Sequence, residues 1–203
     1  MDKRDVALFL HVGVVIIGFM IAAVLHASLH SMVRAQSAEQ ARPFAALVHR
    51  LEPLFPIVAL LILGFGAWLI HLEKGFVDWG DGWILTSLIT LIVIEGLSGT
   101  LLAPRSKKLI SAIDAAPNGP MSAELRRQAS DPMIWDLAHI GTLGFLGVVF
   151  VMVSKPSGGV SVVLVVVGVI VGVLLSRWQL ALAAKATGTA SASGAGASSP
   201  ATP

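Results

Sequence analysis

The chain has 203 residues, of which 55% are hydrophobic and only 13% are charged, and it contains no cysteine. A soluble domain averages about 25% charged residues, so the composition excludes an ordinary soluble domain and a disordered chain. A formal net charge of +2 excludes a strongly basic nucleic-acid binder, and the absence of cysteine excludes a disulfide framework, a Cys-ligated zinc site and an iron–sulfur centre. The composition is that of a membrane protein.

Uninterrupted apolar runs dominate the sequence. A helix needs about 20 apolar residues to cross a bilayer. Five runs are long enough, and they cover about residues 6–29, 54–72, 83–103, 135–154 and 160–182. The first exceeds the apolar segment of about 7–15 residues found in a secretion signal, so we read it as a span. We therefore predict an all-α, polytopic membrane bundle with five transmembrane helices over residues 1–185.

The connections between the spans carry their own signals. Residues 32–51 read as a surface helix interrupted at Pro43, and Pro104 is expected to end the third span. Short helices are predicted over residues 107–116 and 122–129, with Ser122 as an N-cap. The small, uncharged residues 186–203 predict a disordered tail.

The basic residues are distributed unequally between the two sets of loops. Ten of the 14 Lys and Arg residues lie in the first connection, the third connection and the C-terminal end, and four lie on the other side. Cytoplasmic loops carry an excess of Lys and Arg. This bias predicts the N-terminus outside and the C-terminus in the cytoplasm.

Ionisable side chains inside a membrane are costly, so each is a candidate functional residue. The spans contain four histidines and one glutamate, with one aspartate at a span edge: His11, His26, His71, His139, Glu95 and Asp136. At about 1.5 Å per residue, His11 and His71 fall in one layer near the outer boundary. His26, Glu95 and His139 fall in a second layer near the inner boundary.

These two layers predict different chemistry. Imidazoles ligate haem iron, copper or zinc, so His11 and His71 on facing helices are candidate ligands of haem b or of a metal such as copper. The inner layer is suited to a proton or transport path through Glu95, His139, His26 and Asp136. Asp136 precedes His139 by three residues and could orient its ring. The alternative for each histidine is a hydrogen-bonded or interfacial residue without chemistry.

Glycines at helical spacing predict close packing between spans. Gly168 and Gly172 form a GxxxG pattern in the fifth span, and Gly141 and Gly144 recur in the fourth. Small residues let helices approach closely in lipid. The pattern favours packing within the chain, with a homo-oligomer or a membrane-complex partner as the alternative.

Two stretches resemble a known group of proteins. The first runs from Val6 to Gly18 around His11, and the second runs from Arg50 through the segment Gly64-Phe-Gly-Ala-Trp68 to Trp83. They resemble an uncharacterised bacterial integral membrane family of the CopD-like group, which includes copper-resistance D and HemJ-type proteins. The resemblance implies a multi-span protein of the bacterial cytoplasmic membrane with a haem or copper site at His11.

Three functions are therefore kept open. The first is a protein that binds haem or a metal ion for redox or metal handling. The second is a small proton-coupled transporter using Glu95 and His139, and the third is a non-catalytic packing subunit of a membrane complex. No phosphate-binding loop or nucleophile–base pair is present, so we lean against an enzyme. The expected partners are the lipid bilayer and other membrane proteins, not nucleic acid.

Overall fold

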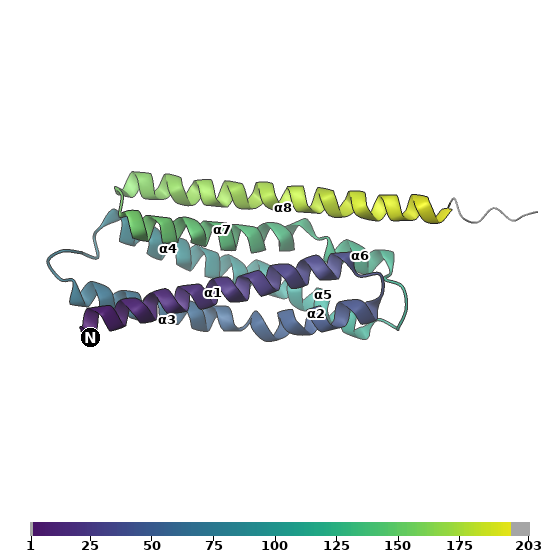
Figure 1. The fold of residues 1–203 in the computed structure, drawn as a ribbon, viewed down its shortest axis with the longest axis horizontal. Helices are drawn as coiled ribbons and strands as arrows, with labels where there is room; N and C mark the ends of the chain where they lie inside the picture. The colour runs from purple at the N-terminus through teal and green to yellow at the C-terminus, as the bar shows by residue number, and fades with distance from the viewer. Residues whose placement is uncertain (1, 196–203) are drawn as a thin grey trace, which may run out of the picture.

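The computed structural model describes residues 2–195, with side chains to residue 185, as a bundle of long helices (Figure 1). The elements are α1 (Lys3–Arg34), α2 (Ala38–Leu51), α3 (Leu54–Leu72), α4 (Gly82–Leu97), a π-helical segment η1 (Ser98–Leu102), α5 (Ala103–Ala115), α6 (Ala123–Ala129), α7 (Pro132–Ser154) and α8 (Gly158–Ala195). No β-strand occurs in this described part of the chain.

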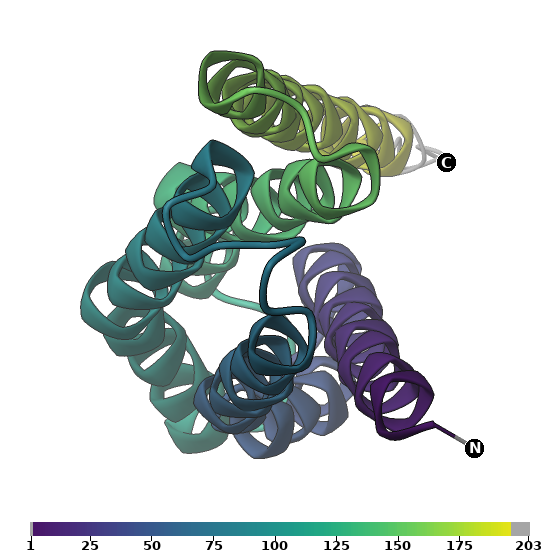
Figure 2. The same cartoon turned by 90° about the vertical axis from the view of Figure 1, so that its left-hand side faces the viewer.

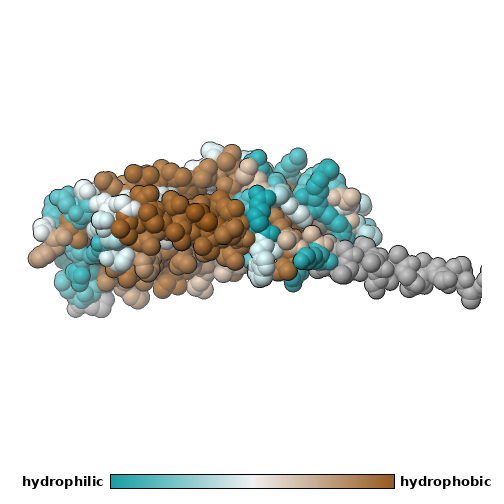
Figure 3. Space-filling view, turned by 90° about the horizontal axis from the view of Figure 1, so that it is seen from above, coloured by the Kyte–Doolittle hydropathy of each residue, from teal (hydrophilic) through white to brown (hydrophobic). Residues whose placement is uncertain are grey.

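Five stretches of the bundle are long and apolar enough to cross a membrane. They contain the five predicted spans, so the all-α fold and the five-helix architecture are confirmed. In Figure 3 the space-filling surface has a broad apolar band with hydrophilic residues at both ends. Large apolar side chains are exposed along the band, as a lipid-facing surface requires.

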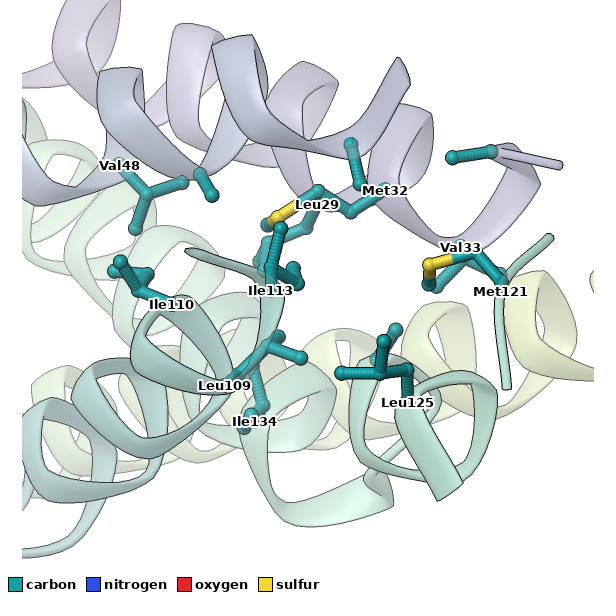
Figure 4. Close-up of a cluster of buried hydrophobic side chains, with 14 of the residues drawn as sticks. Leu29, Met32, Val33, Val48, Leu109, Ile110, Ile113, Met121, Leu125 and Ile134 are labelled. Carbon is teal, nitrogen blue, oxygen red and sulfur yellow. The ribbon is translucent and has the colours of Figure 1, made fainter. Parts of the chain in front are cut away.

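The most extensive core lies at one end of the bundle, where α2, α5 and α6 pack around the C-terminal half of α1 (Figure 1). Figure 4 shows this cluster, in which Leu29 and Met32 of α1 meet Ile113 of α5 and Leu125 of α6. Arg42 of α2 fixes the turn after α5 by donating to the carbonyl oxygen of Ala116 over 2.5 Å. We call this the capped end of the bundle.

The spanning helices pack in two groups. Along α1, Val14 packs with Val58 and Ile62 of α3 and with Leu91 of α4. Viewed along the bundle, α8 lies at the periphery against α7 (Figure 2). The pairing of α7 and α8 buries Val148, Val151 and Val165.

The GxxxG pattern of α8 is used inside the chain. A Cβ atom added to Gly172 would lie 2.8 Å from the carbonyl oxygen of His139, and one added to Gly168 would collide with the carbonyl of Leu143. Added Cβ atoms at Gly141 and Gly144 would make ordinary van der Waals contacts with Ile94. Gly168 and Gly172 therefore allow the backbones of α7 and α8 to touch.

Two predictions that rested on proline are wrong: the interruption at Pro43 and the end of the third span at Pro104. The break after the first span falls at residues 35–37, and Pro43 lies inside α2. Pro104 does not end the third helix, because the chain widens into η1 and continues as α5. The Leu101 carbonyl accepts a hydrogen bond from the Arg105 guanidinium at 2.9 Å. A π-helical turn can absorb the disruption that proline causes in a regular helix.

The short helices predicted before the fourth span are confirmed, and part of the predicted tail is helical. The short helices before the fourth span are α5 and α6, and the Ser122 hydroxyl accepts from the Leu125 amide as the predicted N-cap. The backbone of α8 continues to Ala195, into the segment predicted to be a disordered tail. Residues 196–203 of that tail lie outside the described residues.

Candidate functional site

Two histidines from different spans meet at the inner layer predicted from the sequence. His26 of α1 and His139 of α7 have ring centroids 4.6 Å apart, with the rings nearly perpendicular at 87°. His139 is only 3% exposed, and the Nε2 atom of His26 is buried without a hydrogen-bond partner. We call these two residues the histidine pair.

The backbone determines which nitrogen of each ring is free. Nδ1 of His26 lies 2.8 Å from the Ala22 carbonyl oxygen, and Nδ1 of His139 lies 2.8 Å from the Trp135 carbonyl oxygen. A carbonyl oxygen can only accept, so both Nδ1 atoms carry the proton and donate it. In the neutral rings the lone pair is therefore on Nε2, where it can accept a proton or bind a metal.

His11 has the same arrangement in another part of the bundle. Its Nδ1 atom donates to the Ile62 carbonyl oxygen of α3 over 3.1 Å. Gly66, one turn further along α3, makes room for the ring, because an added Cβ would lie 3.3 Å from Cε1 of His11.

His71 does not face His11. It follows Gly66 by five residues, which turns it about 140° around α3 and moves it about 7.5 Å along the axis, and its side chain is exposed. A bis-histidine haem needs both rings on opposite sides of one iron. The two residues as arranged do not fit a shared haem or a shared metal ion, so we derive no chemistry through such a group.

The sequence placed Glu95 in the same layer as the histidine pair. In the structure it makes no hydrogen bond or ring contact with either histidine. It follows Leu91 of the buried α1–α3–α4 cluster by one helical turn, so it lies on the bundle-facing side of α4. Its half-buried carboxylate has no hydrogen bond or ion pair among the side chains described, which end at residue 185. The adjacent Ile94 packs on Gly141 of α7. His139 is turned about 160° from Gly141 around that helix.

Asp136 does not orient His139, contrary to the prediction. Its carboxylate accepts a hydrogen bond from the Ser176 hydroxyl at 2.6 Å and pairs with the Arg177 guanidinium at 2.5 Å. Asp136 therefore joins α7 to α8. The Trp135 carbonyl takes the orienting role, which a helical backbone can supply without any additional side chain.

Sequence reasoning missed two rings beside the pair. Trp135 stacks on His139 with centroids 5.9 Å apart and an interplanar angle of 19°. His30 lies 6.0 Å from Trp135, also measured between centroids. The spacing i, i+4 of His26 with His30, and of Trp135 with His139, is the signal that could have revealed them.

Comparison with known proteins assigns no family to the chain. No protein-family model matches the chain, and no curated protein or solved structure matches it. Within the described residues, no group of three or more His, Asp or Glu side chains could hold a metal ion. The fold and the site define a multi-pass helical membrane protein in which imidazoles of two spans are in contact. The resemblance to the CopD-like group stays a prediction.

Proposed function

We propose that this chain is a small proton-coupled transporter whose proton-accepting group is the histidine pair. One observation carries the proposal: two imidazoles from different spans are in contact, and both have Nδ1 bonded to the backbone, so that Nε2 is left as the base. A carrier needs a buried group that can gain and lose a proton near neutral pH, and histidine is the side chain suited to this.

The contact between the rings limits how much charge the site holds. Two positive charges within about 5 Å of each other in a buried site repel strongly. The pair therefore holds one exchangeable proton at moderate cost. Because the rings belong to α1 and α7, gain of a proton changes the interaction between two helices, which is how proton binding can be coupled to a change in helix packing.

Glu95 is the second proton-accepting group of the proposal. A carboxylate inside a span must be protonated or paired, and this one has no partner in the described part of the chain. We infer that Glu95 takes a proton or a cationic solute when the helices rearrange. It makes no hydrogen bond or ion pair with either ring, so it is a second proton-accepting group rather than a member of the pair.

The location proposed for the protein is the bacterial cytoplasmic membrane, with the N-terminus outside. Ten Lys and Arg residues belong to the capped end and the C-terminal half of α8, against four at the other end. The positive-inside rule assigns the more basic end to the cytoplasm.

The function is tested in inside-out membrane vesicles from cells that express the full chain. Respiration sets up a pH gradient, which is followed with a pH-sensitive dye while Na⁺, K⁺, Ca²⁺, Zn²⁺ and small organic ions are added in turn. We expect at least one solute to release part of the gradient in vesicles with the protein and not in vesicles without it.

Asparagine is the informative replacement at the pair. Its amide can still donate to the backbone carbonyl, as Nδ1 does, but it has no basic nitrogen. We expect His26→Asn and His139→Asn each to reduce the response at least about tenfold, while the exposed His49→Asn retains it. A response that survives in the double variant His26→Asn/His139→Asn would contradict the proposal.

A further inference from the structure

The histidine pair is one half of a larger arrangement of rings. His26 and His30 are one turn apart on α1, and Trp135 and His139 are one turn apart on α7. The rings form two layers about 6 Å apart along the helix axes: His26 with His139, and His30 with Trp135. The second layer lies on the side of the capped end.

Trp135 covers His139 from that side. Its side chain is 1% exposed, and its indole Nε1 donates to the Ala129 carbonyl oxygen at the end of α6 over 3.0 Å. The indole face is stacked on the imidazole of His139. A ring held in this way excludes water from the capped-end side of the pair. It also stabilises the protonated imidazole of His139 by a cation–π interaction.

His30 is the partly exposed ring of the layer nearer the capped end. The charged groups next to these rings along the chain are cationic or engaged elsewhere. Arg34 follows His30 by one turn on α1, and Asp136, beside Trp135, is bound to Ser176 and Arg177 of α8. No carboxylate in the described residues is bonded to any of the three histidines, so a proton on the group is not trapped.

We propose that protons reach the histidine pair from the capped end through His30, with Trp135 closing the path and holding the protonated form of His139. The inference rests on the proposed proton-coupled function and adds the direction of access and two residues to it. Trp135 acts through the pair, so it is a positioning residue. His30 carries the proton to the pair and is not part of the proton-accepting site.

A spectroscopic experiment tests the Trp135–His139 contact without any transport. A protonated imidazole quenches the fluorescence of an indole that it touches. The Trp135 signal is obtained as the difference between the wild-type protein and Trp135→Phe in detergent. We expect it to fall at least about twofold as the pH is lowered from 8 to 5, and the fall to vanish in His139→Asn. A difference signal that is independent of pH in the wild-type protein would overturn the role of Trp135.

Vesicle transport tests the access path. With a solute that releases the gradient, we expect His30→Asn to reduce the maximal rate at least about tenfold without changing the KM for the solute, and His49→Asn to have no effect. A membrane-impermeant sulfonate buffer should restore the rate of His30→Asn only when it is added on the side of the capped end. Trp135→Ala should leak protons without solute at least about fivefold faster than the wild type, and Trp135→Phe should not.

The outcomes separate the inference from the function on which it rests. Transport that is lost in His139→Asn but unchanged in His30→Asn overturns the inference and leaves the proposed function intact. Rescue by buffer on the opposite side overturns the direction of access alone. Wild-type vesicles that respond to no solute overturn the proposed function and, with it, the access path, even where the fluorescence titration is observed.

Discussion

Three histidines within the spans are held by the same hydrogen bond from Nδ1 to a helix carbonyl. His11, His26 and His139 all donate in this way, although His11 bonds to a neighbouring helix and the other two bond to their own. The tautomer with the proton on Nδ1 is thus imposed by the backbone. It leaves three basic nitrogens inside the bundle.

This tautomer is directly measurable. In protein labelled with ¹⁵N-histidine, we expect the neutral rings of His11, His26 and His139 to show a protonated Nδ1 and an unprotonated Nε2. The exposed His49 and His71 serve as the control, since they should show mainly the opposite tautomer found in water. Protonated Nε2 atoms in the neutral rings of His26 and His139 would remove the basis for the proton-accepting pair.

At the scale of single residues, the sequence predicted the depth of side chains in the bundle better than it predicted their partners. The depth argument put His26 and His139 in one layer, and the structure brings them into contact. The spacing paired Asp136 with His139, and the depth argument paired His11 with His71; the structure gives Asp136, His139 and His11 other hydrogen-bond partners. The reason is rotational: depth follows from residue counting, but the direction of a side chain depends on how each helix is turned toward its neighbours.

At the scale of the helices, contact between α7 and α8 depends on Gly172. Its replacement by alanine would place a Cβ 2.8 Å from the His139 carbonyl oxygen and 3.0 Å from the carbonyl carbon. These are backbone atoms of a helix, so they cannot turn aside as a side chain would. We expect Gly172→Ala to lower the free energy of unfolding in detergent by about 1–3 kcal/mol.

Gly13 of α1 provides the matched control for that experiment. No atom lies within 4 Å of the Cβ that alanine would add there. Alanine is favoured over glycine within a helix, so Gly13→Ala should leave the stability unchanged or raise it by up to about 1 kcal/mol. Equal losses of stability in the two variants would mean that the close approach of α8 to α7 is not what Gly172 provides.

Helix boundaries were harder to predict than helix existence. The apolar runs predicted all five spans, since no soluble element tolerates about 20 apolar residues in succession. Proline was the misleading signal at Pro43 and Pro104. Proline is costly in a regular helix, but at Pro104 a π-helical turn and the hydrogen bond from Arg105 to the Leu101 carbonyl reduce that cost.

At the scale of the whole molecule, the proposed orientation can be tested with single cysteines, because the natural sequence has none. Ala115→Cys lies on the exposed end of α5 at the capped end, and Gly80→Cys lies on the exposed loop before α4 at the other. In intact cells an impermeant maleimide should label Gly80→Cys and not Ala115→Cys. After the membrane is permeabilised, both should react. Labelling of Ala115→Cys in intact cells would reverse the orientation.

The approach of α8 to His139 also has a consequence for how the sequence can change over evolution. Gly172 makes room for the backbone of residue 139 and not for its imidazole. A descendant that lost the histidine would gain no freedom at position 172, because the carbonyl stays where it is. Selection on Gly172 should therefore follow the architecture, while selection on His139 should follow the chemistry. Descendants that keep the glycine and lose the histidine would have inherited the scaffold without the proposed proton site.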